Sequence, residues 1–389
     1  MLRGLYYYCN QRVILYSLRP HQQHAVNQMW DTDKGQVIMA TGSGKTMCMI
    51  DDTIANFQTT PYKTHVVVSP RILLTLQLSR EFLEHIDNAF VCHVHSGDTP
   101  HFRSTKPDEL RMMGMMTGHK LIFTTYHSLH RIVESGLHVD TIYFDESHNS
   151  TRSDFFPSVR HMSTVGSDRS FFFTATPRHS CVDDKPGMND TTVYGNIVSS
   201  ATAKDMVSAG YILPPQLLAS GEGEVSTNQQ IQQSVRGNNL QRSLVCMRST
   251  AQLVRFLASE EHNDLAEDYD IFHITSQLGA RINGKRVKRH TFFKRLREHK
   301  GKFILLHVRI LSEGINLSNL DSCVILRSMN TIDILQTIGR VIRLGDDKTV
   351  GKVVLPTSSK YLSKYLKTLS HIIVDTFDKG KVPVQYIKR

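Results

Sequence analysis

Two acidic side chains and an imidazole stand together in the stretch IYFDESH, at residues 142–148. The apolar run that precedes the acids is typical of a buried strand, so Asp145 and Glu146 are expected at a strand end. Paired carboxylates in that position could ligate a metal ion or act as a general base. They could equally be solvated residues of an ordinary turn, and the stretch alone does not decide between these hypotheses.

A second stretch, MATGSGKT at residues 39–46, could bind a phosphate. Its glycines would let the backbone turn tightly so that N–H groups surround the anion, and the helical-looking segment after it would add the positive end of its dipole. Lys45 could reach the β- and γ-phosphates of a nucleotide, and the Thr46 hydroxyl could ligate Mg²⁺. The strict phosphate-loop pattern has Gly where this chain has Met39, so a glycine turn with a chance lysine remains the alternative.

The two stretches explain each other if the chain binds ATP and Mg²⁺. In phosphate-loop enzymes a second strand end supplies an acid to the metal ion, which is the position of Asp145. Glu146 would then orient and deprotonate the attacking water as the general base, and His148 would connect the site to a neighbouring segment. We therefore predict Lys45, Asp145 and Glu146 as catalytic residues, and Thr46 and Asp145 as metal ligands. The loop residues predicted to bind the nucleotide are Thr41, Gly42, Ser43, Gly44, Lys45 and Thr46.

Short apolar runs that alternate with longer helical-looking segments must position these residues. Such runs are typical of parallel sheets with helices on both faces, and the chain contains two sets of them. They are QVIM (36–39), HVVVS (65–69), LIFTTY (121–126), TIYFD (141–145), SFFFT (170–174), SLVCM (243–247), DIFHIT (270–275), KFILLHV (302–308), SCVIL (322–326) and KVVLP (352–356). The polar stretch 220–241 is the best linker candidate, and Pro214 and Pro215 precede it. We therefore predict two α/β domains, 1–213 and 214–389.

Composition limits the possible classes of protein. The chain has 389 residues, too many for one ordinary core, and a net charge of +10 that favours a polyanionic partner. Its six cysteines are scattered without a C-x-x-C pair. This pattern disfavours a disulfide framework, a zinc ribbon or an iron–sulfur cluster, and it favours an intracellular, reducing compartment. No apolar run reaches the ~18 residues of a membrane span, so we predict no membrane partner.

An ordered series of motifs between residues 18 and 345 resembles the superfamily 2 helicases and translocases. The series adds to MATGSGKT and DESH the stretches LRPHQ (18–22), VVVSPRILLTLQ (66–77), TTYHSL (124–129), TATP (174–177), LVCMRST (244–250), VRILSEGINLSNLD (308–321) and QTIGRVIR (336–343). An ordered series is much more specific than any one of its members. The resemblance implies two RecA-like domains, with ATP in the cleft between them and a nucleic-acid strand across their tops.

The resemblance also implies roles for residues that the first two stretches do not include. Arg19 and Gln22 would lie on the adenine side of the nucleotide. Gly314 and Asn316 would belong to the motif that nucleotide and nucleic acid share, although many relatives carry Asp at the position of Asn316. Arg340 and Arg343 would be catalytic, because an arginine fork neutralises charge on the transferring phosphoryl group. If these arginines belong to the second domain, hydrolysis depends on domain closure. Thr174 and Thr176 would couple hydrolysis to that movement.

The function predicted from these features is ATP-dependent nucleic-acid helicase or translocase activity. The residues of the motifs DESH, SPRILL, AGYILPP (209–215) and LSEGINL resemble those of the DNA-repair and restriction-motor branches, which favours DNA over RNA. An RNA helicase remains an alternative, as does a motor subunit of a restriction or repair complex that translocates without unwinding. A catalytically silent binding module would lack some of the catalytic residues, all of which are present. A non-motor phosphate-loop enzyme such as a kinase would leave the motifs of the second domain unexplained.

Two further stretches have an open interpretation. Residues 281–302 are strongly basic, with Glu298 the only acid, and could either contact phosphates or form a solvated helix face. Phe292 and Phe293 within it are expected in the core. The stretch CHVH (92–95) suggests a metal site, but alternation along a strand would separate the cysteine from the two histidines and leave too few ligands.

Overall fold

The computed structural model describes residues 16–220, 225–308, 317, 319–345, 348–356 and 360–387, with the side chains of 360–364 left aside. The chain forms two compact units. The first comprises residues 1–37, 44–173 and 190–200, and the second comprises 38–43, 174–189 and 201–389. The domain ranges 1–213 and 214–389 stay a prediction.

The first sheet has eight strands in the order β4-β3-β5-β2-β6-β7-β1-β9. Its strands are β1 (Lys34–Met39), β2 (Thr64–Ser69), β3 (Ala89–Val94), β4 (Phe102–Arg103), β5 (His119–Thr125), β6 (Val139–Phe144), β7 (Ser167–Thr174) and β9 (Ile197–Ala201). The register of the parallel strands β2, β5 and β6 aligns Val68 with both Thr124 and Phe144. The carboxyl ends of these strands therefore meet at one edge, where Asp145 follows β6.

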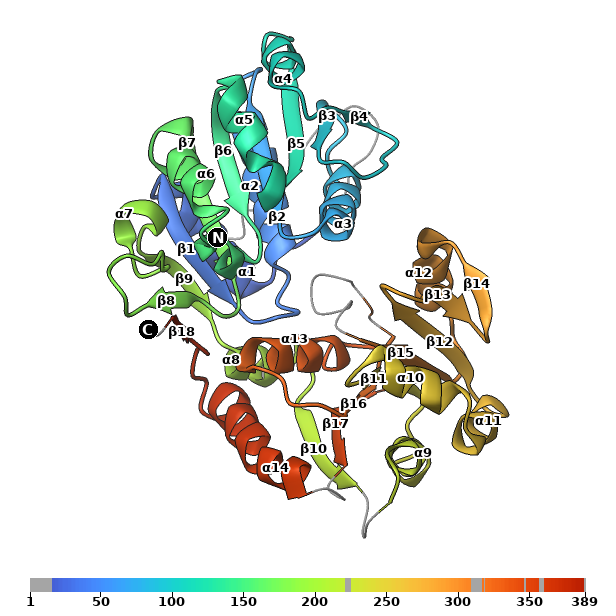
Figure 1. Ribbon diagram of the computed structural model, residues 1–389. Helices are drawn as coiled ribbons and strands as arrows, with labels where there is room; N and C mark the ends of the chain where they lie inside the picture. Colours follow the sequence, from blue (N-terminus) through green and yellow to red (C-terminus); the bar gives the residue numbers. More distant parts are fainter. Residues whose placement is uncertain are drawn as a thin grey trace. The chain divides into compact units, whose positions relative to one another are not determined.

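Helices cover both faces of this sheet (Figure 1). They are α1 (Pro20–Trp30), α2 (Lys45–Phe57), α3 (Ile72–Leu83), α4 (Pro107–Gly114), α5 (Leu129–Ser135), α6 (Phe156–His161) and α7 (Thr191–Tyr194), with the short turns η1 (Tyr126–Ser128), η2 (Ser147–Thr151) and η3 (Met162–Gly166). Helix α1 packs on α2, and α5 packs on both α4 and α6. An ion pair fixes the phosphate-loop helix to the sheet, because the Arg169 guanidinium of β7 contacts Asp52 of α2 at 3.0 Å.

The second sheet also has eight strands, in the order β10-β17-β16-β11-β15-β12-β13-β14. Its strands are β10 (Pro215–Ser220), β11 (Arg242–Cys246), β12 (Asp270–Thr275), β13 (Gly279–Ile282), β14 (Lys285–Val287), β15 (Phe303–His307), β16 (Ser322–Ile325) and β17 (Gly351–Pro356). The strands run parallel except for β13 and β14, which form an antiparallel hairpin that continues the sheet beyond β12. A separate pair of strands, β8 (Arg178–Ser180) and β18 (Gln385–Ile387), is parallel.

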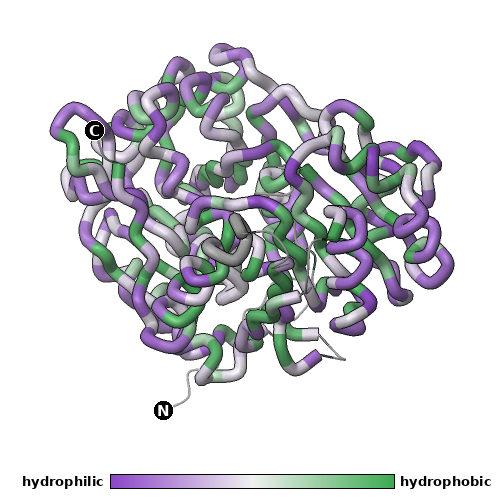
Figure 2. Tube along the Cα trace, turned by 60° about the horizontal axis from the view of Figure 1, so that its bottom comes forward, coloured by the Kyte–Doolittle hydropathy of each residue, from purple (hydrophilic) through white to green (hydrophobic). Residues whose placement is uncertain are grey.

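The helices of the second unit complete an α/β architecture (Figure 1). They are α8 (Ala203–Ser208), α9 (Thr227–Gly237), α10 (Thr250–Leu257), α11 (Glu260–Ala266), α12 (Arg289–Glu298), α13 (Thr331–Val341), α14 (Lys360–Ile373) and η4 (Val374–Asp378). Side chains of α9 and α10 pack with those of β11 and β15 in one buried apolar cluster. Hydrophobic residues lie mainly inside and hydrophilic ones outside (Figure 2). None of the described helices has the length and apolarity needed to span a bilayer.

The α/β prediction is confirmed, and all ten apolar runs form strands. The interpretation of 220–241 as a linker is wrong for residues 227–237, which form α9 and bury Ile231 and Val235. These two residues are four positions apart, as one helix face requires, and the Ser226 side chain accepts a hydrogen bond from the backbone of Gln229 at the helix start. The polar composition hid this amphipathic pattern.

Candidate functional site

The phosphate loop connects β1 to α2 through two left-handed glycines. Gly42 has φ 87° and Gly44 has φ 85°, a region that other residues enter only at a cost. Gly44 is also held closely, because a Cβ there would come within 2.2 Å of the Gln22 side-chain nitrogen. Helix α2 begins directly at Lys45, so Lys45 and Thr46 occupy its first turn. The loop therefore has the strand–turn–helix context that phosphate binding requires.

Gln22, predicted on the adenine side, is buried against this loop. Its Nε2 donates a hydrogen bond to the Gly44 carbonyl at 3.3 Å, and its Oε1 accepts one from the Arg19 backbone at 2.9 Å. The amide thus connects the start of α1 to the phosphate loop. A contact of Arg19 or Gln22 with adenine stays a prediction.

We expect Gly44→Ala to weaken ATP binding by about tenfold or more, because strain of about 1–3 kcal/mol falls on the loop itself. Gly118→Ala is a matched control, since Gly118 has φ 89° and a Cβ there would meet nothing within 4 Å. Isothermal titration of ATP into both variants measures the difference. Equal ATP affinities for the two variants would contradict a role of Gly44 in the nucleotide site.

Asp145 and Glu146 leave the carboxyl edge of the first sheet in two different conformations. The Asp145 N–H still continues the sheet, donating to the Val68 carbonyl at 2.8 Å, and the Tyr126 hydroxyl donates to the Asp145 carbonyl at 3.0 Å. Glu146 adopts φ 47° and ψ 50°, a left-handed conformation that is costly for a residue with a side chain. Backbone strain of this kind is concentrated at functional sites. The left-handed residue changes the direction of the chain immediately after Asp145.

The electrostatics of Asp145 suit a divalent cation. Asp145 is only 6% exposed. Burial and the neighbouring Glu146 raise the pKa of Asp145, and the Lys45 ammonium opposes this by favouring the ionised form. The positive charge of Lys45 therefore does not fully offset the burial and the Glu146 charge that disfavour ionisation of Asp145. A metal ion would supply the missing positive charge, and carboxylate and hydroxyl oxygens such as those of Asp145 and Thr46 are ligands that Mg²⁺ prefers.

His148 is positioned to hold the Glu146 side chain. Its Nδ1 lies 3.5 Å from the Glu146 Oε2, and its Nε2 lies 3.2 Å from the Asn149 side-chain nitrogen. Because that amide nitrogen can only donate, Nε2 accepts and Nδ1 carries the proton that faces Glu146. Asn149 also donates to the Glu146 carbonyl at 3.0 Å. The role of His148 as a connection to a neighbouring segment stays a prediction.

Within the second unit, α13 lies against the first half of the phosphate loop. A Cβ on Gly339 would come 2.6 Å from the Thr41 Cγ2, and a Cβ on Gly42 would lie 3.9 Å from the Arg343 Cγ. Three residues predicted for the site, Thr41, Gly42 and Arg343, are therefore brought together. Arg343 is half-buried and follows the end of the helix by two residues.

Arg340 is buried within the second unit, with 4% of its surface exposed. Beside it is a pair that the sequence analysis missed, the His307 imidazole at 3.3 Å from the Cys246 thiol. Burial, and then the charges of Arg340 and Arg327, lower the pKa of His307 to about 3. The ring is therefore neutral and adds no positive charge beside Arg340. His307 and Cys246 are the last residues of the apolar strands β15 and β11, so sequence spacing gives no sign that their side chains meet.

The remaining predicted residues divide into two groups. Gly314 and Asn316 lie outside the described residues. Thr174 and Thr176 form a local turn in which the Thr176 N–H donates to the Thr174 hydroxyl at 3.1 Å. Their coupling role stays a prediction.

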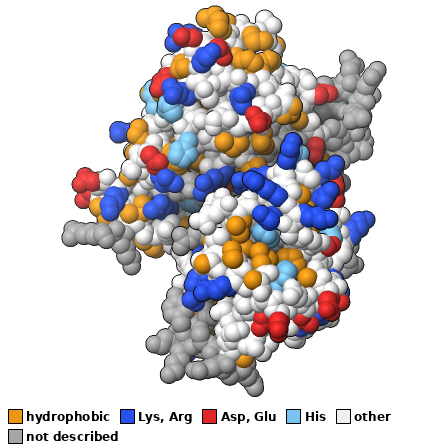
Figure 3. Space-filling model, turned by 45° about the vertical axis from the view of Figure 1, so that its right-hand side comes forward, with side chains coloured by type: hydrophobic (Ala, Val, Ile, Leu, Met, Phe, Trp, Pro, Cys, Tyr) orange, Lys and Arg blue, Asp and Glu red, His pale blue; other side chains and the backbone are white. Residues whose placement is uncertain are grey.

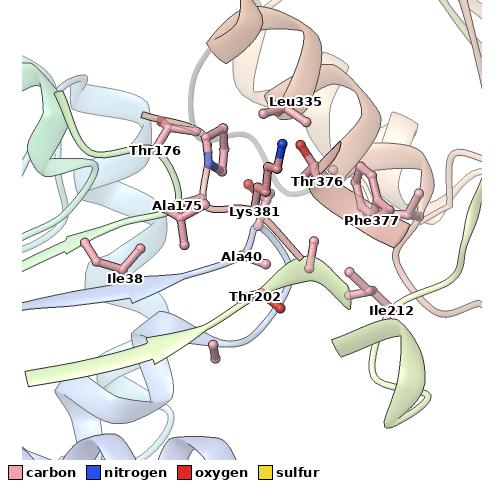
Figure 4. Close-up of a pocket in the computed structure, with 17 residues that line it drawn as sticks. Ile38, Ala40, Ala175, Thr176, Thr202, Ile212, Leu335, Thr376, Phe377 and Lys381 are labelled. Carbon is pink, nitrogen blue, oxygen red and sulfur yellow. The ribbon is translucent and has the colours of Figure 1, made fainter. Parts of the chain in front are cut away.

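A small cavity of about 40 Å³ lies beside these threonines in the second unit (Figure 4). Thr41, Thr176, Leu335, Phe377 and Lys381 are among the residues that line it. Ligand pockets for drug-sized molecules are typically ~300–1,000 Å³, so this cavity is much too small for a nucleotide. Thr41 lines it together with residues of α13 and η4.

The histidines of CHVH form a hydrogen-bonded pair. The His93 Nδ1 lies 3.0 Å from the His95 Nε2, and the His93 Nε2 lies 3.1 Å from the Ser79 hydroxyl. The Gly97 N–H donates to the His95 Nδ1 at 3.1 Å, so every ring nitrogen of the pair has a partner in the protein. Burial lowers the pKa of His93 to about 3. This is a neutral structural network.

Comparison with known proteins gives two matches to family models. Residues 15–179 match the family described as Type III restriction enzyme, res subunit. Residues 227–345 match the helicase conserved C-terminal domain. No curated protein matches the chain. The first match contains the phosphate loop and DESH, and the second contains α13 with Arg340 and Arg343.

Two solved structures share the fold. The ATP-dependent Type ISP restriction-modification enzyme LlaBIII bound to DNA superposes with a TM-score of 0.70 at 19% sequence identity, over 96% of this chain and 31% of that one. A nuclease-deletion mutant of the Type ISP restriction-modification enzyme LlaGI, in complex with a DNA substrate mimic, superposes with a TM-score of 0.68 at 19% sequence identity. The match covers 95% of this chain and 30% of that one. The chain thus spans about a third of the length of these enzymes.

Proposed function

Because the chain belongs to the superfamily 2 helicases, in their restriction-type branch, and has two RecA-like domains, we propose that it is an ATP-driven motor that moves along DNA. Proteins with these domains hydrolyse ATP. The observation that supports the proposal most directly is the site of the first unit, where a left-handed glycine loop at the start of α2 brings Lys45 into electrostatic contact with Asp145 at the end of β6.

In the proposed mechanism the loop N–H groups and the N-terminus of α2 bind the phosphates of ATP, with Lys45 at the β- and γ-phosphates. Mg²⁺, held by Thr46 and Asp145, would balance charge on the phosphate oxygens. Glu146 takes a proton from the attacking water while the His148 Nδ1–H holds its carboxylate in place. Arg340 and Arg343 neutralise the charge that develops on the transferring group.

The solved structures that share the fold favour DNA as the track. Both solved relatives were captured with DNA or a DNA mimic. The net charge of +10 favours a polyanion, although it does not distinguish DNA from RNA. Because those relatives are about three times longer than the matched region, a motor that works with further domains or partner proteins, and translocates without unwinding, is a second candidate. An RNA helicase remains the alternative in substrate.

We expect ATP hydrolysis to rise when DNA of arbitrary sequence is added, because phosphate contacts position a motor without reading bases. With about six to ten phosphate contacts, affinity should fall roughly 10³- to 10⁵-fold between 50 and 200 mM salt. Matched single- and double-stranded DNA and RNA oligonucleotides, titrated into the same hydrolysis assay, make the test. Stimulation by RNA alone would support the RNA-helicase alternative, and no stimulation by either polymer would contradict the motor proposal.

A further inference from the structure

Helix α12 and the β13–β14 hairpin form one continuous element at the edge of the second sheet (Figure 1). One face of α12 is anchored in the core, where Phe292, Phe293 and Leu296 are buried and the Phe292 ring packs edge-on against Phe272 at 5.7 Å. The expectation that both phenylalanines belong to the core is confirmed. Anchoring of this apolar face directs the charged residues of the helix to solvent.

The exposed side of this element carries an unbalanced positive charge, and we call it the basic surface. Its nine exposed side chains are Lys285, Arg286, Lys288, Arg289, Lys294, Arg295, Arg297, Lys300 and Lys302. None of them forms an ion pair with an acidic residue in the part of the chain that the structure describes. The neighbouring Asp270 is bound instead by Asn283 at 2.6 Å and faces His299 at 3.3 Å. Lysine and arginine side chains gather on this face of the second unit (Figure 3).

An ordinary solvated face looks different in the same unit. On α9 and α11, Arg236 contacts Asp264 at 2.9 Å and also pairs with Asp268, so charges of both signs alternate. On α12 the like charges of Lys294 and Arg297 are three residues apart and repel one another, and the only acid of the helix, the exposed Glu298, forms no ion pair among the described residues. A polyanion bound there would remove this repulsion and release counterions.

The basic surface has no exposed Phe, Tyr or Trp side chain on which unpaired bases could stack. The only Phe, Tyr or Trp residues of 279–302 are Phe292 and Phe293, and both are buried. Proteins that hold single strands combine basic grooves with exposed aromatic side chains, so their absence here favours contacts to backbone phosphates alone. Helix α12 has 10 residues and is therefore ~15 Å long. About nine phosphate charges lie along ~15 Å of duplex axis, which is comparable to the charge of the surface.

We propose that the basic surface is a binding site for the phosphate backbone of duplex DNA, separate from the motor motifs. The inference rests on the proposed function, because DNA is the track that the motor is proposed to follow. The site adds affinity without sequence preference, since lysine and arginine contacts to phosphate carry no sequence information. It also places a DNA contact on the second unit that does not involve the residues of the ATP site.

A variant with four glutamines tests the site. Its substitutions are Lys285→Gln, Arg286→Gln, Lys294→Gln and Arg297→Gln. A control variant removes the same charge from exposed positions elsewhere in the second unit. Its substitutions are Lys204→Gln, Arg255→Gln, Lys367→Gln and Lys379→Gln. Duplex binding is measured by fluorescence anisotropy over a salt series, alongside ATP hydrolysis with and without DNA.

We expect the first variant to bind duplex DNA about tenfold or more weakly at low salt, and its plot of log affinity against log salt to be shallower by about three to four units. Hydrolysis without DNA should equal that of the wild type, and the control variant should keep the wild-type slope. An unchanged slope, an equal loss in the control, or a loss confined to single strands would overturn the inference. A wild-type protein that binds no duplex would instead overturn the proposed function itself.

Discussion

Replacing Glu146 by Gln is expected to lower ATP hydrolysis by about two to four orders of magnitude, which is the usual contribution of a general base. The amide keeps the size of the carboxyl group and the left-handed backbone of residue 146, but it cannot accept the proton of the attacking water. Steady-state phosphate release measures the loss. Glu134→Gln, at an exposed position in the same unit, is the matched control and should hydrolyse ATP at the wild-type rate.

The same substitution should leave ATP binding intact. Glu146 raises the pKa of Asp145, so removing its charge favours the ionised form of Asp145. Asp145 therefore keeps an ionised carboxylate for Mg²⁺, and a titration with Mg²⁺-ATP separates a loss of binding from a loss of catalysis. An ATP affinity near that of the wild type, with hydrolysis nearly abolished, is the expected pair of results. Near-normal turnover would show that another group accepts the proton.

The phosphate loop and the acid pair were predictable because each follows an apolar strand with residue types typical of nucleotide binding. These are glycines before Lys45 and Thr46 in the loop, and two adjacent acids at residues 145 and 146. Glycine at positions 42 and 44 indicates left-handed turns, and the structure has them. The left-handed conformation of Glu146 was not predictable, since nothing in the residue type favours it. The partners of Gln22 and the burial of Arg340 depend on contacts between segments far apart in sequence, which spacing along the chain does not report.

The sequence contains a turn signal for the β13–β14 hairpin. Asn283 and Gly284 both have positive φ, at 46° and 77°, as a two-residue hairpin turn of the Asn-Gly type requires. The two strands were not predicted because they contain charged residues and no apolar run. They are held by pairing, β13 with β12 and β14 with β13. The charge of the basic stretch is readable from the sequence, whereas its position in a hairpin at the edge of the sheet depends on strand pairing. Its proposed binding surface follows from that structure.

Arg343→Ala is expected to lower the rate of ATP hydrolysis by about 10³- to 10⁵-fold, the usual contribution of an arginine that stabilises charge on a transferring phosphoryl group. The stem of Arg343 lies beside Gly42 of the phosphate loop, whereas Arg340 is buried near His307. The two arginines should therefore differ in a second measurement, thermal unfolding. Arg343→Ala should keep the wild-type melting temperature, because the side chain is only half-buried.

Arg340→Ala should impair hydrolysis and also lower the melting temperature, because it empties a buried position packed among core residues of the second unit. Arg343→Lys separates charge from geometry, since lysine keeps the positive charge but loses the planar fork. We expect this variant to recover only a small part of the lost rate. Arg255→Ala, at an exposed arginine of the same unit, should leave both the rate and the melting temperature unchanged. If Arg343→Ala hydrolyses ATP as fast as the Arg255 control, the charge on the phosphoryl group is neutralised by other residues and the proposed catalytic role of Arg343 is wrong.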